Sequence, residues 1–173
     1  MNIQDILNQL AYKEPGIMGR ENFKQSAVLI PLVEKNNEAH LLFEVRSMQL
    51  RRQPGDICFP GGRIDPDDST PMDCAIRETT EELGIHFNQI TDVTPIDYVV
   101  ADMGRIIYPY VGRISDINTI RPNEAEVGEV FYVPISHLRQ TTPESYKVNI
   151  EVIPEDNFPF DLIVGGEKYN WQT

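Results

Sequence analysis

The sequence predicts an α/β domain in which helices pack on the faces of a mixed β-sheet. Short apolar runs bounded by turn-forming residues, which are typical of strands, occur along most of the chain. Stretches with helical spacing lie between these runs. The chain has neither an internal repeat nor a low-complexity linker, and 173 residues can bury the core of one domain. We therefore expect residues 1–173 to form a single domain.

The first quarter of the chain predicts a helix followed by a β-hairpin. Apolar residues recur at helical spacing in residues 2–12, which predicts an amphipathic helix. Residues 26–33 and 39–45 are apolar, and the polar cluster between them is typical of a turn. These two runs therefore favour a pair of antiparallel strands.

A short strand, a loop and a helix are expected next. Residues 55–59 predict a strand that ends at the diglycine Gly61-Gly62. The polar loop 63–70 is rich in Asp, and its last residues can cap a helix. That helix is expected to begin near Pro71, which suits a first turn, and to stop at Gly84.

The rest of the chain predicts mainly strands. Three apolar runs are strand-like, at residues 97–101, 106–114 and 129–133. Residues 135–138 follow a proline and suggest a short helix. Residues 146–153 alternate apolar and polar side chains, which predicts a further strand.

Composition and charge argue against several classes of function. The formal net charge is −12, whereas non-specific nucleic-acid binding depends on Lys and Arg that neutralise phosphates. The N-terminal residues do not resemble a signal peptide, and no apolar run is long enough to span a bilayer. Cys58 and Cys74 lack metal-ligand spacing and are expected to be reduced, partly buried thiols. We expect a cytoplasmic protein that binds neither nucleic acid nor membrane.

Residues 77–85 carry the clearest chemical signal. On a helix, Glu78, Glu81 and Glu82 stand at positions i, i+3 and i+4, so their carboxylates are expected on one face. Two carboxylates about 6 Å apart repel by roughly 3 kcal/mol at an effective dielectric constant near 20. Oxygen ligands of this kind suit Mg²⁺ or Mn²⁺. The alternative is an acidic helix face that only contacts solvent.

The diglycine before the helix favours a binding site. Glycines let backbone approach a ligand closely, although a plain tight turn uses the same residues. A strand, a diglycine, a polar loop and an arginine–glutamate helix follow one another within residues 57–85. This order resembles the Nudix box, at about residues 62–85. Its opening glycine corresponds to Gly62, and its closing half corresponds to Arg77, Glu78, Glu81, Glu82, Gly84 and Ile85.

The resemblance implies a Nudix-type α/β/α sandwich with a mixed β-sheet. Two features differ from the general motif, because the loop acid is Asp68 rather than Glu and one additional residue separates it from Arg77. Members of this family usually continue beyond the position of Thr173 into another strand and a closing helix, and the resemblance therefore implies that these two elements are missing from residues 1–173.

The resemblance also implies roles for the acidic residues. Glu78, Glu81 and Glu82 would bind Mg²⁺ or Mn²⁺, the expected cofactor. Glu81 or Glu126 would act in catalysis by accepting a proton from water that attacks phosphorus.

A second motif resembles the signature of the coenzyme A branch of Nudix hydrolases. Its residues here are Arg46-Ser47, Arg51, Gly55 and Phe59-Pro60-Gly61-Gly62. Glu44 stands where the start of that signature has a threonine. The resemblance implies substrate binding by Arg46, Arg51, Gly61 and Gly62. Coenzyme A carries a 3′-phosphate and a diphosphate, and guanidinium groups bind such oxygens bidentately.

The function implied is hydrolysis of the diphosphate of coenzyme A or its derivatives, to 4′-phosphopantetheine and adenosine 3′,5′-bisphosphate. Two alternatives stay open. The first is a Nudix hydrolase of another nucleoside diphosphate derivative, such as ADP-ribose. The second is a non-catalytic nucleotide-sensing module, although such domains typically lack box glutamates and this chain keeps all three. We expect a small-molecule nucleotide as the partner, and a homodimer as a possible assembly.

Overall fold

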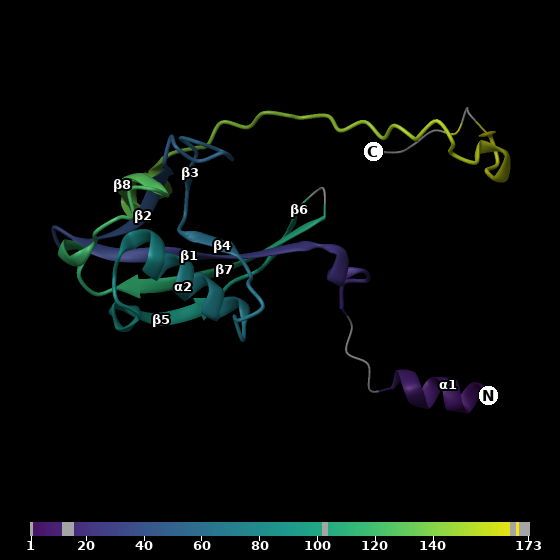
Figure 1. The fold of residues 1–173 in the computed structure, drawn as a ribbon, viewed down its shortest axis with the longest axis horizontal. Helices are drawn as coiled ribbons and strands as arrows, with labels where there is room; N and C mark the ends of the chain where they lie inside the picture. The colour runs from purple at the N-terminus through teal and green to yellow at the C-terminus, as the bar shows by residue number, and fades with distance from the viewer. Residues whose placement is uncertain (1, 12–15, 102–103, 167–168, 170–173) are drawn as a thin grey trace. The chain divides into compact units, whose positions relative to one another are not determined.

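The computed structural model describes residues 2–11, 16–101, 104–166 and 169 of the chain (Figure 1). Contacts divide the chain into two compact units, residues 1–140 and residues 141–173. All strands and α-helices of the described residues belong to the first unit. Four short 3-10 helices complete the described elements: η1 (Arg20–Asn22), η2 (Phe87–Gln89), η3 (Ile117–Thr119) and η4 (Phe160–Leu162).

The strands of the first unit form one mixed sheet, as predicted. They are β1 (Lys24–Lys35), β2 (Glu38–Arg46), β3 (Ile57–Cys58), β4 (Gly61–Arg63), β5 (Ile90–Pro95), β6 (Val99–Ala101), β7 (Arg105–Ile114) and β8 (Val127–Pro134). Their main order is β3-β2-β1-β7-β5, while β4 pairs with β1, β6 with β7 and β8 with β2. The pair β1–β7 is parallel and the other described pairs are antiparallel. The α/β class with a mixed sheet is therefore confirmed.

The β1–β2 hairpin is confirmed, with strands longer than expected. Its turn consists of Asn36 and Asn37, whose φ angles are 54° and 59°. Two successive positive φ angles give the two-residue turn whose twist matches that of antiparallel strands, and Asn tolerates this conformation. Burial alternates along both strands, so one side of each strand faces the core.

The diglycine lies inside a strand, which corrects the prediction that the preceding strand ends there. Gly61 and Gly62 belong to β4, where they pair with Val28 and Ala27 of β1. A Cβ atom at Gly61 would lie 2.6 Å from Val28 Cα and still closer to the Ala27 carbonyl oxygen. The two backbones therefore approach too closely for a side chain at this position.

The helix α2 (Pro71–Leu83) has the predicted bounds. Thr70 Oγ1 accepts a hydrogen bond from the Asp73 amide, Pro71 occupies the first turn, and Gly84 ends the helix with φ 60°. Figure 1 shows α2 lying along the sheet, and its contacts are with β1, β4 and β7. The core between these layers includes Ala27, Leu29, Leu42, Cys74, Ala75, Leu83, Tyr110 and Ile114.

The two other predicted helices also form. The first is α1 (Ile3–Leu10), which Asn2 caps through hydrogen bonds with Asp5. The other is α3 (Ile135–Gln140), directly after β8. Among the described residues, no helix is both long and apolar enough to cross a membrane. Both cysteines are free thiols, with Cys74 buried and Cys58 half-buried, as expected.

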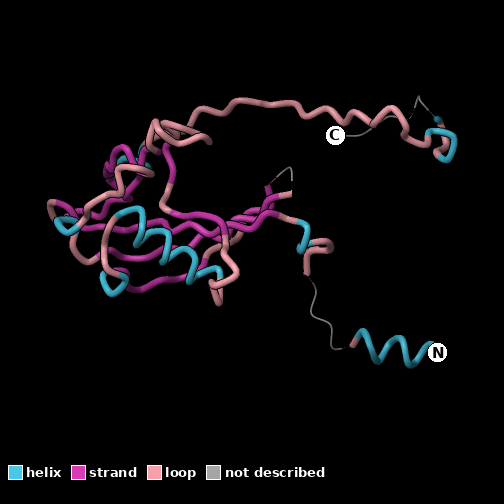
Figure 2. The backbone as a smooth tube through the Cα atoms, viewed as in Figure 1, coloured by secondary structure: helices cyan, strands magenta, loops and turns pink. Residues whose placement is uncertain are grey.

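Two predictions for the later strands differ from the structure, and one strand was not predicted. The run 97–101 is shorter as β6, and β5 was not predicted because its burial pattern is mostly exposed. The strand predicted at 146–153 is wrong, since the segment is loop (Figure 2) and is paired with no strand among the described residues. Tyr146 and Val148 are 82% and 86% exposed. Alternation alone does not make a strand, because backbone N–H and C=O groups need partners. That residues 1–173 make one domain stays a prediction.

Candidate active site

Two glutamates of α2 face the diglycine of β4. Glu82 Oε2 accepts a hydrogen bond from the Gly61 amide at 2.8 Å, and Glu82 is only 4% exposed. Glu78 lies against the next residue, because a Cβ atom at Gly62 would be 2.6 Å from Glu78 Oε2 and would overlap its carboxyl carbon. The diglycine thus provides one hydrogen-bond donor and the space that a second carboxylate occupies.

The third box glutamate has different surroundings. The Glu81 side chain is 54% exposed and lies 3.3 Å from Nη1 of Arg77, one helical turn earlier. Figure 1 shows α2 with one side against the sheet, and Glu82 belongs to its buried residues. The structure therefore brings Glu78 and Glu82 to the diglycine and places Glu81 on the solvent side of the helix.

Arg77 connects the Asp-rich loop to α2. Its Nε lies 2.9 Å from Asp68 Oδ1, and its Nη2 lies 3.0 Å from Asp68 Oδ2. Its Nη1 also lies 2.9 Å from Glu78 Oε1. The hydrogen bonds that Arg77 donates to Asp68 lower the pKa of Asp68 to about 2. The loop acid of the motif is therefore held by an arginine, and it fixes the loop next to Glu78.

Glu126, predicted from the family resemblance, lies beside the other carboxylates. The Asn123 amide donates to the carbonyl oxygen of Glu82 at 2.9 Å, and Asn123 Nδ2 donates to Glu126 Oε2 at 3.3 Å. The Ser47 amide donates to the carbonyl oxygen of Glu126 at 2.8 Å. The segment before β8 is thus attached both to the C-terminal end of α2 and to the end of β2, and this attachment positions Glu126.

Glu44 of β2 is a member of the site that was not predicted. It is 1% exposed, and its Oε1 accepts a hydrogen bond from Cys58 Sγ at 3.3 Å. Its Oε2 is buried and has no hydrogen-bond partner among the residues that the structure describes. The signal was present in the sequence, because the period of two along β2 puts Leu42 and Glu44 on the same core-facing side.

We call the four residues Glu44, Glu78, Glu82 and Glu126 the carboxylate cluster. Burial and mutual repulsion both act on the carboxylates of this cluster. Burial and then the charge of Glu44 raise the pKa of Glu82 to about 8, although the Gly61 amide opposes this shift. Burial also raises the pKa of Glu78 and of Glu44, and in each case the charge of Glu126 adds to the increase. A cation in the cluster would favour the charged carboxylates.

The residues of the cluster fit a hard divalent cation. In the part of the chain that the structure describes, no group of three or more His, Cys, Asp or Glu side chains is already arranged to hold a metal ion. The donor set nevertheless consists of carboxylate oxygens, which Mg²⁺ and Mn²⁺ prefer. A cation would also provide a partner for Glu44 Oε2, which has none among the described residues, and it could bind the Glu78 carboxylate that lies beside Gly62.

The predicted substrate-binding arginines have unequal surroundings. Arg46 ends β2 and is half-buried, and in the described part of the chain its buried Nε has no hydrogen-bond partner. Its charge lowers the pKa of Glu44, so the guanidinium lies near the cluster. Arg51 is exposed in the turn region after β2. The structure thus places Arg46 at the site and Arg51 on the surface.

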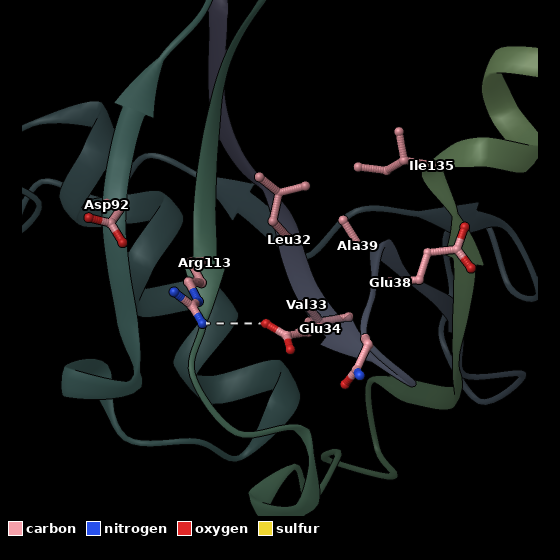
Figure 3. Close-up of a pocket in the computed structure, with 9 residues that line it drawn as sticks. Leu32, Val33, Glu34, Glu38, Ala39, Asp92, Arg113 and Ile135 are labelled. Carbon is pink, nitrogen blue, oxygen red and sulfur yellow. Dashed lines mark ion pairs between the residues drawn. The ribbon is translucent and has the colours of Figure 1, made fainter.

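A separate hollow lies near the turn of the β1–β2 hairpin (Figure 3). Its volume is about 560 Å³, and its lining includes Leu32, Ala39 and Ile135. Arg113 and Glu34 form an exposed ion pair at 3.8 Å on its wall. The hollow shares no residue with the carboxylate cluster, and none of the predicted site residues lines it.

Solved structures of low sequence identity share the fold. The NUDIX domain of NrtR from Shewanella oneidensis, solved with ADP ribose, matches with a TM-score of 0.54 at 17% identity, over 82% of this chain and 89% of that chain. The Ap4A hydrolase of Caenorhabditis elegans, in a binary complex, matches with a TM-score of 0.54 at 18% identity, over 66% of this chain and 82% of that chain.

Curated relatives match a part of the chain. The peroxisomal coenzyme A diphosphatase NUDT7 of Mus musculus is 45% identical over 64 residues, which are 37% of this chain and 27% of that protein. The uncharacterized Nudix hydrolase NudL of Escherichia coli K12 is 38% identical over 87 residues, which are 49% and 44% of the two chains. The matches thus span less than half of these relatives. The family model of the NUDIX domain matches residues 23–155, and the chain therefore belongs to the NUDIX domain family.

Proposed function

We propose that this protein is a metal-dependent pyrophosphohydrolase that cleaves the diphosphate of coenzyme A or its derivatives. The products would be 4′-phosphopantetheine and adenosine 3′,5′-bisphosphate. The observation that carries the proposal is the arrangement of Glu78 and Glu82 against the diglycine, with Glu126 beside them. The name of the mouse relative supports the choice of coenzyme A, over the residues that the two chains share.

The chain's own residues would divide the chemistry between them. Glu78 and Glu82 would hold the cation, with Glu81 beside them on the helix. When bound, Mg²⁺ or Mn²⁺ supplies charge neutralisation for the diphosphate and increases the acidity of a nearby water. Glu126 or Glu81 would accept the proton as that water attacks phosphorus. The charge of Glu126 acts on both Glu78 and Glu82, which supports its choice over Glu81, whose carboxylate is paired with Arg77.

Substrate binding would use the arginines before the diglycine. A guanidinium binds phosphate oxygens bidentately, and Arg46 has a buried Nε whose hydrogen has no acceptor among the residues that the structure describes. Arg51 is exposed and would be free to reach the 3′-phosphate or the diphosphate. The Gly61 amide already donates to Glu82, so the diglycine would act mainly by letting the substrate approach Gly62.

One observation favours a second candidate, a hydrolase of another nucleoside diphosphate derivative such as ADP-ribose. Glu44 replaces the threonine of the coenzyme A signature and lies in the site itself. The solved NUDIX domain of NrtR contains ADP ribose, but its likeness to this chain extends to the fold alone. A cytoplasmic location and a homodimer stay predictions, and the mouse relative is named as a peroxisomal protein.

A substrate panel with product identification tests the proposal. Coenzyme A, 3′-dephospho-coenzyme A and ADP-ribose would each be incubated with the protein and Mg²⁺ or Mn²⁺. We expect the highest kcat/KM for coenzyme A, with release of 4′-phosphopantetheine. Faster hydrolysis of ADP-ribose would transfer the proposal to the second candidate. Nucleotide binding without turnover of any of the three would instead identify a non-catalytic module.

A further inference from the structure

Glu44 is a buried acidic side chain that has one hydrogen-bond partner among the described residues. It lies on the core-facing side of β2, two residues after Leu42, and is 1% exposed. Cys58 on the neighbouring strand β3 donates to one carboxylate oxygen, and the other oxygen is buried without a partner. Buried polar atoms without partners are rare in native proteins because they lose the hydrogen bonds of water. A missing ligand would explain this one.

The surroundings of Glu44 restrict what that ligand can be. Arg46 lies two residues further along the same strand and its charge acts on Glu44, but Glu44 Oε2 has no hydrogen-bond partner among the described residues, so Arg46 does not bond to that oxygen. The Glu44 charge acts on Glu82, and the Glu126 charge acts on both. Carboxylates from α2, from β2 and from the segment before β8 therefore lie close enough for their charges to act on one another. A cation is the ligand that satisfies several such groups together.

We propose that Glu44 is a further oxygen ligand of the divalent cation, in addition to the glutamates of the box helix. This inference rests on the proposed metal-dependent function, because it concerns the same ion. The free Oε2 of Glu44 is the ligating atom, while the Cys58 thiol keeps Oε1 in place. Glu44 is thus a ligand that this chain carries on the sheet, whereas the box ligands lie on α2.

Mn²⁺ binding to the whole protein tests the inference without using turnover. The variants are Glu44→Gln, which keeps the shape of the side chain, and Glu44→Thr. The matched control is Glu129→Gln on β8, an exposed residue paired with Val45 that faces away from Glu44 and changes the net charge equally. Electron paramagnetic resonance of free Mn²⁺ gives Kd, and thermal unfolding without metal shows which variants are folded.

We expect Glu44→Gln and Glu44→Thr to weaken Mn²⁺ binding by roughly tenfold to a hundredfold, while Glu129→Gln binds like the wild type. A folded Glu44 variant that binds as tightly as Glu129→Gln overturns the inference and leaves the metal-dependent function intact. A wild-type protein that binds no Mn²⁺ overturns both. If Glu44→Gln does not fold, the Kd of Glu44→Thr decides by the same criterion.

Discussion

The backbone amide of Gly61 donates a hydrogen bond to Oε2 of Glu82, with 2.8 Å between the two atoms. The two residues are 21 positions apart, on β4 and on α2. This bond fixes one carboxylate oxygen on the strand and opposes the rise in the pKa of Glu82 that burial causes. The arginine-held loop between them adds a second connection, since Asp68 binds Arg77. These two connections hold the diglycine strand β4 and the glutamate helix α2 against each other.

The two glycines of β4 are expected to respond differently to Ala. At Gly62 the three atoms nearest to the new methyl group belong to the carboxylate at the far end of the Glu78 side chain, so stability should change by less than about 1 kcal/mol while turnover falls roughly tenfold or more. At Gly61 it would meet the backbone of Ala27 and Val28, and stability should fall by about 2 kcal/mol. Urea unfolding and kcat measure both effects. Equal loss of stability in the two variants would contradict this difference.

Stability should depend on pH through Asp68. Arg77 lowers the pKa of Asp68 to about 2, whereas an unfolded Asp has a pKa of about 3.9. A lowered folded-state pKa gives stability that is present above about pH 4 and is lost as the pH falls toward 2. Asp68→Asn should therefore cost about 1 kcal/mol at pH 7 and almost nothing near pH 2.

The measurement for Asp68 is the free energy of unfolding of both proteins as a function of pH. The exposed Asp67 in the same loop provides the control, as Asp67→Asn. We expect no comparable pH dependence for the control. A constant difference between the wild type and Asp68→Asn from pH 7 to pH 2 would show that the ion pair with Arg77 is not the cause.

The arginines of the coenzyme A signature should determine specificity. If Arg46 or Arg51 binds the 3′-phosphate, its change to Ala should lower the ratio of kcat/KM for coenzyme A to that for 3′-dephospho-coenzyme A. A charge-assisted hydrogen bond contributes about 1.5–3 kcal/mol, so the loss should be roughly tenfold to a hundredfold. Binding to the diphosphate would weaken both substrates and leave the ratio unchanged. Arg52→Ala, in the same exposed turn region, is the matched control.

Local sequence patterns predicted the elements that local interactions determine. The bounds of α2 follow from a capping Thr70, from Pro71 and from Gly84, which act within one turn of the helix. The hairpin follows from Asn36 and Asn37, which accept positive φ angles. These signals need no knowledge of the rest of the chain, and the structure reproduces both elements.

Long-range contacts explain the features that the sequence did not predict. β4 is a strand because Gly61 and Gly62 pair with a segment more than thirty residues earlier. The segment 146–153 alternates like a strand but has no pairing strand among the described residues. Whether a segment becomes a strand depends on a partner strand elsewhere in the sheet. Local sequence patterns therefore missed β4 and wrongly predicted a strand at 146–153.

The site was predicted to the extent that its residues belong to one motif. Glu78 and Glu82 were found because a helical repeat places them together. Glu44 was not found, because its charge acts on Glu82, a residue 38 positions away on α2, rather than on a neighbouring residue in the sequence. Its charged side chain at a core-facing position was the one signal available, and it was interpreted only as a departure from the signature.

Glu82 provides the decisive measurement for metal-dependent hydrolysis, namely kcat of the Glu82→Gln variant with coenzyme A at saturating Mg²⁺. Gln cannot supply the anionic oxygen that Gly61 orients, so we expect kcat to fall by roughly a hundredfold or more. The melting temperature without metal should stay equal or rise slightly, because burial and the charge of Glu44 disfavour a negative charge on this side chain and Gln carries none. A folded Glu82→Gln protein with near-normal kcat at saturating Mg²⁺ would contradict the assignment of the metal site.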